Sequence, residues 1–376
     1  MRRSTPAKRR IKEPDRLGLA ERLGELPRGR KTGRGLPFSS AEGRARLAEW
    51  LESLKRTAAG KALKSLVDEH QPLAALLGGV AAEAPYLWDL VRADPLRLVG
   101  FLTHDPEDEL AKLLARVRAD AAPALDSDAV MRSLRRMKAG AALLIALADI
   151  GGVWPLARVT TALTDVAGTA LGEAVRYLLR EAARGGKLIL RDLEHPESGS
   201  GFIILAMGKM GGYELNFSSD IDLMIFFDPS VSALTPRLEA APFFARLTRE
   251  LVKLLQERTA DGYVFRVDLR LRPDPSSTQV AISTDAALNY YESRGQNWER
   301  AALIKARPCA GDREPGDRLL RELSPFVWRK YLDYAAVADV HAMKQQIHAY
   351  RGHGEIAVEG HNVKLGRGGI REIEFF

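Results

Sequence analysis

The sequence lacks the features that would set it apart from ordinary globular proteins. Among its 376 residues only Cys309 is a cysteine, so no internal disulfide and no cysteine-based zinc cluster is expected. The longest apolar run, around residues 142–148, is far shorter than the roughly 18–20 residues of a membrane helix, and no signal-like segment follows Met1. With 46% hydrophobic and 28% charged residues, a fibrous or wholly disordered chain is excluded. We expect a protein of a reducing, cytoplasmic compartment without a membrane partner.

Little net charge remains once the first 36 residues are set aside. Those residues contain twelve Lys or Arg and four acids, so their +8 exceeds the +7 of the whole chain and leaves −1 for residues 37–376. Because nucleic-acid-binding proteins carry basic charge on the folded surface, the near-neutral body argues against a nucleic-acid partner. Few large apolar residues occur in residues 1–38, and we expect a basic, disordered tail there. A segment that docks on an anionic partner is the alternative.

Residues 39–190 are predicted to form a helical domain without chemistry of its own. Leu47, Trp50, Leu51 and Leu54 recur at spacings of three and four, which places them on one helix face. The Asp-Pro pairs at 94–95 and 105–106 are typical of helix starts, with the aspartate as cap. A long helix is expected over residues 155–184.

At Gly201 the apolar period changes from that of helices to that of strands. Strands are predicted at residues 201–208, 219–227, 263–271 and 279–283, with a glycine-rich turn over 208–217 and a helix over 238–258. From residue 284 to about 349 the pattern is helical again. Since the chain stops on apolar residues, we expect that the polypeptide continues or that this is a fragment.

Three aspartates on the predicted strands form the candidate site. Asp220 and Asp222 are two residues apart and share one face of a strand, where a divalent cation such as Mg²⁺ would relieve their repulsion. Asp268 shares a face with Arg270 and Arg272, which suits a metal site beside a polyanion. If the two strands pair, the carboxylates converge as metal-assisted nucleotidyl transfer requires. The alternatives are solvated aspartates and a salt-bridged edge strand.

The turn at residues 208–212, GKMGG, precedes the aspartate pair. Its glycines leave backbone N–H groups unobstructed, as phosphate-binding turns require. No Gly-Lys-Ser/Thr sequence ends it, so it is not a P-loop. A plain hairpin connection is the alternative.

Together these motifs resemble the polymerase-beta-type nucleotidyltransferases: Gly-Gly, a spacer, Asp-x-Asp and a later strand aspartate. Four longer strings, beginning at Met207, Val267, Asn297 and Asn362, resemble the family of glutamine synthetase adenylyltransferase/adenylyl-removing enzymes, in that family's order. The resemblance implies an α+β fold. A polymerase-beta-type nucleotidyltransferase domain at 191–310, with a mixed sheet and helices, would be flanked by the helical region and by a helical, truncated part at 311–376.

That family contains two such domains, and this chain resembles the N-terminal one. The resemblance implies that it removes AMP from an adenylylated tyrosine of glutamine synthetase by Mg²⁺-dependent phosphorolysis, giving ADP, within a bifunctional regulator of nitrogen assimilation. Glutamine synthetase is the implied partner, with the PII signalling protein as a second candidate. The alternatives are adenylylation from ATP, a nucleotidyltransferase for another substrate, and a regulatory module without catalysis.

Site residues follow from the same resemblance. It implies that Asp220, Asp222 and Asp268 bind the metal and act in catalysis, and that phosphate is contacted by Gly211, Gly212 and Ser219. We further expect Arg270, Arg272 and Lys305 to bind phosphate or the nucleotide. Lys305 and Arg307 are predicted to follow Glu299 on one helix, where an ion pair is the alternative role. Glu372 and Glu374 are candidates to approach the same site.

Overall fold

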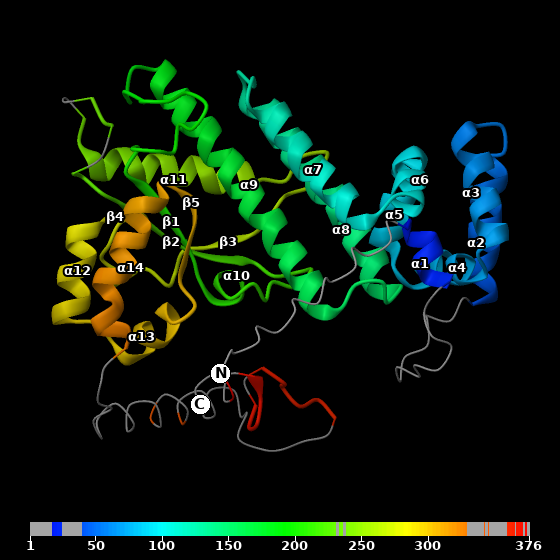
Figure 1. The fold of residues 1–376 in the computed structure, drawn as a ribbon. Helices are drawn as coiled ribbons and strands as arrows, with labels where there is room; N and C mark the ends of the chain where they lie inside the picture. The colour runs from blue at the N-terminus through cyan, green and yellow to red at the C-terminus, as the bar shows by residue number, and fades with distance from the viewer. Residues whose placement is uncertain are drawn as a thin grey trace, which may run out of the picture. The chain divides into compact units, whose positions relative to one another are not determined.

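In the computed structural model of the chain (Figure 1), the residues described are 17–24, 40–230, 233–235, 238–328, 342, 345, 359–364, 366–370 and 373. The chain divides into two compact units. The first comprises residues 1–116 and 137–162, and the second comprises residues 117–136 and 163–376. The predicted boundary at residue 190 falls inside the second unit. No helix within the described ranges is long and apolar enough to cross a membrane.

The first unit is helical, as the sequence predicts. Asp94 and Asp105 cap helices as expected, accepting hydrogen bonds from the N–H groups of Arg97 at 2.9 Å and Glu107 at 2.7 Å. Its helices are α1 (Leu19–Gly24), α2 (Ala41–Ser53), α3 (Ala58–Glu69), α4 (Gln71–Glu83), α5 (Pro85–Ala93) and α6 (Pro95–Thr103), with parts of α7 (Pro106–Ala121), α8 (Ser127–Ile150) and α9 (Leu156–Arg184). The long helix expected over 155–184 is therefore confirmed.

Part of the predicted disordered tail is ordered. Residues 19–24 form α1, in which Leu19 is 0% exposed and Leu23 is 3% exposed. The Gly18 N–H donates to Glu21 Oε2 at 3.1 Å at the start of this helix, and Arg22 forms an ion pair with Asp105 at 3.7 Å. Two leucines four residues apart are enough to dock a short helix onto an existing apolar surface. The other residues of 1–38, apart from 17 and 18, lie outside the described residues.

The second unit contains a mixed five-stranded sheet. Its elements are β1 (Phe202–Ala206), α10 (Gly208–Gly211), β2 (Ile221–Phe227), α11 (Ala240–Gln256), β3 (Val267–Asp268), β4 (Ile282–Ser283), α12 (Thr284–Ser293), α13 (Asn297–Leu303), β5 (Arg307–Gly311) and α14 (Arg313–Val327). The strand order is β3-β2-β1-β5, and β4 also pairs with β2. β1 runs antiparallel to β2 and β5, whereas β2 is parallel to β3 and β4. The α+β class is therefore confirmed.

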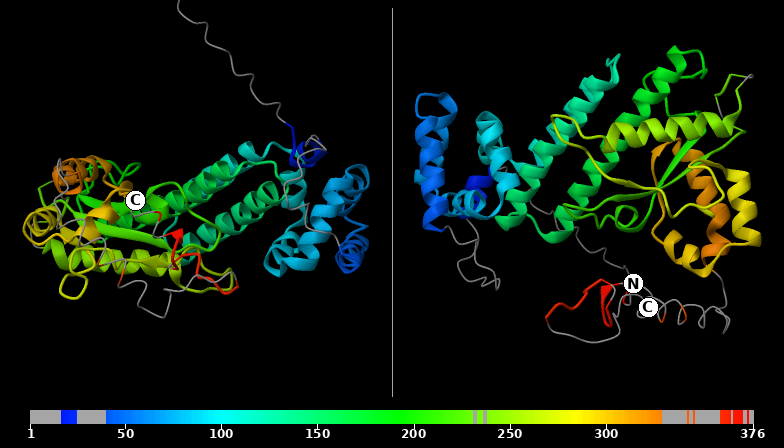
Figure 2. Two further views of the ribbon diagram at one scale, coloured as in Figure 1. Left: turned by 90° about the horizontal axis from the view of Figure 1, so that it is seen from below. Right: turned by 180° about the vertical axis from the view of Figure 1, so that it is seen from behind.

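Helices cover both faces of the central strand β1 (Figures 1 and 2). On one face Phe244 of α11 stacks on Phe202 and Phe227, with ring centroids 5.5 and 5.0 Å apart. On the other face Ile203 and Leu205 belong to a core that includes residues of α12 and α14. This double coverage explains why residues 201–208 read as a continuous apolar run rather than an alternating one.

Two predictions about strands are wrong. Residues 284–349 are not one helical stretch, because residues 307–311 form β5 antiparallel to β1. Strand 263–271 shortens to Val267–Asp268, and its expected alternation fails because Val264 and Phe265 are both buried. Their N–H groups both donate to Leu255 O, at 2.9 and 3.2 Å. The segment therefore docks on the end of α11 before it joins the sheet.

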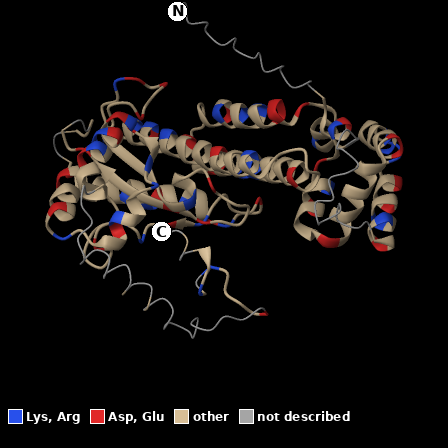
Figure 3. Ribbon diagram, turned by 60° about the horizontal axis from the view of Figure 1, so that its bottom comes forward, with Lys and Arg blue, Asp and Glu red and all other residues tan. Residues whose placement is uncertain are grey.

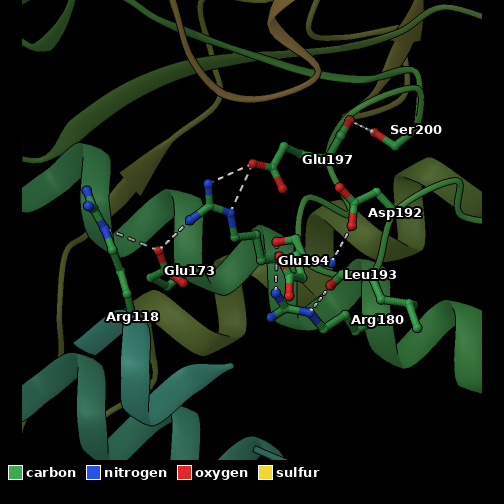
Figure 4. A network of polar contacts seen from close by, with 9 residues as sticks. Arg118, Glu173, Arg180, Asp192, Leu193, Glu194, Glu197 and Ser200 are labelled. Carbon is green, nitrogen blue, oxygen red and sulfur yellow. Dashed lines mark hydrogen bonds and ion pairs between the residues drawn. The ribbon is translucent and has the colours of Figure 1, made fainter. Parts of the chain in front are cut away.

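Charges of both signs are interspersed along the helices (Figure 3). Several are paired along one helix, as with Arg46 and Glu42 at 2.6 Å. Arginine side chains of α9 form hydrogen bonds and ion pairs with the loop that leads from α9 into β1 (Figure 4). Arg176 donates to Glu197 at 3.0 and 2.7 Å, and Arg180 donates to Leu193 O at 2.9 Å. These contacts hold the point at which the chain enters the sheet.

Candidate active site

The pairing of β2 with β3 brings two of the predicted aspartates together. In this parallel pair Asp222 lies opposite Asp268, and the Ile221 N–H donates to Arg266 O at 2.9 Å. Asp220 directly precedes β2 and is exposed. The strand pairing on which the predicted convergence depends is therefore present for Asp222 and Asp268, while the shared metal-binding role of the three aspartates stays a prediction.

Electrostatic repulsion is concentrated on Asp222. The pKa of its half-buried carboxyl is raised to about 6, first by burial and then by the charges of Asp268 and Asp220. Lys364 and Arg270 act in the opposite direction. A carboxylate held among like charges in this way would be relieved by a bound cation.

Asp268 is held by Arg270. The Arg270 N–H donates to Asp268 Oδ1 at 2.8 Å, and the Nε of its guanidinium lies 3.0 and 2.9 Å from the two carboxylate oxygens. These hydrogen bonds are the main reason that the pKa of Asp268 is lowered. Within the described residues, no three Asp, Glu, His or Cys side chains are arranged as a ready-made metal site. The oxygen donors suit Mg²⁺ in their chemistry, and Asp268 would exchange Arg270 for the cation.

The predicted glycine turn begins as the single helical turn α10. The N–H groups of Gly211 and Gly212 donate within it, to Met207 O at 3.0 Å and Gly208 O at 3.1 Å. A Cβ at Gly211 would lie 1.9 Å from Lys305 O, and one at Gly208, whose φ is +50°, would lie 3.2 Å from Asp222 Oδ2. Glycine is thus required here for close approach, while phosphate binding by this turn stays a prediction.

The other predicted contact residues bind groups of the chain itself. Ser219 Oγ is hydrogen-bonded to Asn216 Oδ1. Arg272 donates to Leu269 O at 2.9 Å and to Pro275 O at 2.8 Å, which shapes the loop after β3. Their contacts with phosphate or nucleotide stay predictions.

Lys305 lies in the turn between α13 and β5, where its Nζ lies 2.7 Å from Glu214 Oε2. Arg307 begins β5, so the single helix predicted for Glu299, Lys305 and Arg307 is wrong. The binding of phosphate or nucleotide by Lys305 also stays a prediction. Glu372 and Glu374 lie outside the described residues.

Sequence reasoning did not predict that Lys364 lies near Asp222 or that Glu299 is buried. Lys364, in the glycine-rich string near the chain end, is close enough to Asp222 to influence its pKa. Glu299 is 0% exposed, and its Oε2 accepts from the Gln296 N–H at 2.8 Å and from the Tyr290 hydroxyl at 3.2 Å. The signal for Glu299 was local, since the spacing of Gln296 and Glu299 at the start of α13 is that of a capping box.

The sequence is similar to that of known proteins of one family. A family model described as glutamate-ammonia ligase adenylyltransferase matches residues 74–322. The chain is 58% identical over 359 residues to a bifunctional glutamine synthetase adenylyltransferase/adenylyl-removing enzyme of Bradyrhizobium diazoefficiens, covering 95% of this chain and 35% of the relative. It is 57% identical over 331 residues to a protein of the same name from Xanthobacter autotrophicus, covering 88% and 33% respectively.

The chain thus spans about a third of the length of the curated relatives it matches. The family match includes the sheet, the glycine turn and the three aspartates. On this evidence the chain belongs to the glutamate-ammonia ligase adenylyltransferase family.

Proposed function

We propose that this chain removes AMP from an adenylylated tyrosine of glutamine synthetase by phosphorolysis, as the N-terminal part of a bifunctional enzyme. The observation that carries the proposal is the parallel pairing that sets Asp222 opposite Asp268. The choice of removal over addition rests on the likeness of residues 216–222 to the N-terminal copy of the family's domain. A polymerase-beta-type domain at residues 191–310 is part of the same proposal.

The reaction needs no covalent intermediate with the protein. An oxygen of inorganic phosphate attacks the adenylyl phosphorus, the bond from that phosphorus to the tyrosine oxygen breaks, and the tyrosine leaves as tyrosinate and takes up a proton. The products are ADP and unmodified glutamine synthetase. Asp220, Asp222 and Asp268 would hold Mg²⁺, which when bound supplies charge neutralisation for the phosphate oxygens and the leaving oxygen.

The chain's own residues have the remaining tasks. Arg270, 84% exposed in its side chain, would be released from Asp268 when a cation takes its place and could then bind the incoming phosphate. The turn at 208–212 would form one wall of the phosphate site. The PII signalling protein would modulate this reaction rather than take part in it.

The test uses adenylylated glutamine synthetase, Mg²⁺ and the chain, with and without inorganic phosphate. We expect phosphate-dependent loss of the AMP mass from glutamine synthetase and a matching appearance of ADP. Asp222→Asn should abolish this turnover while the protein stays folded, as circular dichroism would verify. AMP transfer from ATP to unmodified glutamine synthetase, without removal, would show instead that the chain carries the opposite activity.

A further inference from the structure

Arg307 contacts the glycine turn from the side of β5. Its Nη2 donates to Met210 O at 3.1 Å, and its Nε donates to Gly211 O at 3.4 Å. These carbonyls lie in the last turn of α10, where few N–H groups of the helix remain to bond carbonyls. Met210 O also accepts from the Tyr213 N–H at 3.5 Å. The planar fork of an arginine can serve two such carbonyls at once, which the single ammonium group of a lysine does less well.

The same guanidinium stacks on the ring of Tyr213, the residue directly after the turn. Arg307 Cζ lies 4.1 Å from the centroid of the Tyr213 ring. Tyr213 has a φ of 58°, a left-handed conformation that is unfavourable for a residue with a side chain. Stacking against Arg307 therefore favours the one backbone conformation that closes the turn.

On its other side, the turn contacts β2. The Met207 N–H donates to Asp222 O at 2.9 Å, and the backbone of Gly208 is so close to the Asp222 carboxylate that a Cβ would lie 3.2 Å from it. β5 and β2 are the two neighbours of β1 in the sheet. The turn is thus held between Arg307 on one neighbouring strand and Asp222 on the other.

We propose that Arg307 is a positioning residue that holds Tyr213 and the turn at 208–212 against Asp222 without touching the substrate. Among the described residues, its guanidinium bonds to the carbonyls of Met210 and Gly211 and lies over the Tyr213 ring. The consequence for catalysis rests on the proposed function, in which this turn is a wall of the phosphate site. The clamp itself rests only on the contacts.

Hydrogen exchange tests the clamp without reference to activity. In Arg307→Met, we expect the amides of Gly211, Gly212 and Glu214, which bond within the turn, to exchange at least about tenfold faster, while those of α11 are unchanged. Arg307→Lys, which keeps the charge but loses the fork, should give an intermediate rate and stands in if the Met variant does not fold. Arg321→Met, which removes an exposed arginine of α14, is the matched control and should leave the rates unchanged. Equal rates in all variants would overturn the proposal.

Kinetics then separates positioning from a general loss of structure. We expect Arg307→Met to raise the KM for inorganic phosphate roughly tenfold, with a smaller change in kcat and partial recovery in Arg307→Lys. A variant with normal KM and kcat would contradict the catalytic consequence of the clamp. Faster exchange in a chain whose wild type shows no phosphorolysis would refute the proposed function and leave the clamp standing.

Discussion

At the scale of single residues, Asp222 carries an electrostatic cost within the fold. Its pKa, raised to about 6, means that the folded protein keeps a proton that the unfolded chain has lost between about pH 4 and pH 6. The Asp222 side chain therefore favours the folded state only in its neutral form, and its contribution to the free energy of unfolding is lost as the pH rises through this window. Such a cost at a buried group is typical of a functional site.

Replacing this carboxylate should stabilise the protein while abolishing its activity. Without metal, in a chelator at pH 7.5, we expect Asp222→Asn to raise the free energy of unfolding by about 1–3 kcal/mol, because the neutral amide avoids the cost of burying a charge and also removes the repulsion from Asp268 and Asp220. Urea unfolding measures this, and the gain should fade toward pH 4. A destabilised variant at pH 7.5 would show that the carboxylate is well accommodated and that the repulsion argument is wrong.

Arg135, unlike Asp222, is a buried charged side chain whose guanidinium is hydrogen-bonded to four backbone carbonyls. Its side chain is 1% exposed, and it donates to Gly262 O at 2.8 Å and Leu254 O at 3.0 Å, as well as to the carbonyls of Met131 and Glu257. Leu254 lies in the last turn of α11 and Glu257 directly follows that helix, so this one guanidinium joins α8 to the segment that leads from α11 into β3.

Truncating the Arg135 side chain should therefore destabilise the second unit. We expect Arg135→Met to lower the free energy of unfolding by about 2–4 kcal/mol, because buried carbonyls lose their donors. Thermal unfolding measures the loss. Arg136→Met, at an exposed position on the same helix, is the control and should change stability by less than about 0.5 kcal/mol. Equal effects of the two substitutions would contradict the assigned role.

At the scale of elements, α10 shows how glycine serves packing. Gly211 is buried against the backbone of the segment before β5, with Lys305 O 1.9 Å from where a Cβ would lie. Backbone cannot yield as a flexible side chain can, so the turn itself must move if a methyl group is added. The position of the turn relative to Asp222 depends on this contact.

Gly211→Ala should accordingly lower the free energy of unfolding by about 1–3 kcal/mol and reduce turnover at the site. Gly172→Ala is the matched control, because apart from the adjoining backbone of α9 no heavy atom lies within 4 Å of a Cβ at this position. There the substitution should stabilise the protein by roughly 0.5–1 kcal/mol through helix propensity. Both are read from thermal unfolding, and a neutral Gly211→Ala would refute the close packing of the turn.

At the scale of the whole molecule, the basic excess lies in the N-terminal residues and not in the body. Residues 1–16 contain seven Lys or Arg and two acids, and they precede α1, whose leucines are buried in the first unit. The charges of the helices are mixed in sign (Figure 3). Binding to polyanions should therefore depend on the residues before α1.

Deleting residues 1–16 should lower the salt concentration at which the protein elutes from heparin, because five net positive charges are removed. We expect the melting temperature to stay within about 2 °C and the proposed phosphorolysis to be unchanged. Deleting residues 1–24 is the contrasting variant, since it also removes α1 and should lower the melting temperature. Equal heparin elution with and without residues 1–16 would place the polyanion-binding charge on the folded body.

The sequence by itself predicted the helical region and the strands at residues 202–206 and 221–227, because these depend on apolar periodicity. It also singled out the three aspartates as candidate site residues, because their motifs are local in the chain. It did not determine β5, the docking of residues 264–265 on α11, or the partners of Arg270, Arg272 and Lys305. Those depend on which distant backbone groups come within hydrogen-bonding distance. Only the tertiary structure determines these partners. A five-residue strand can pair with many other strands, and an arginine can bond to many acceptors, so the partners depend on which groups the fold brings close.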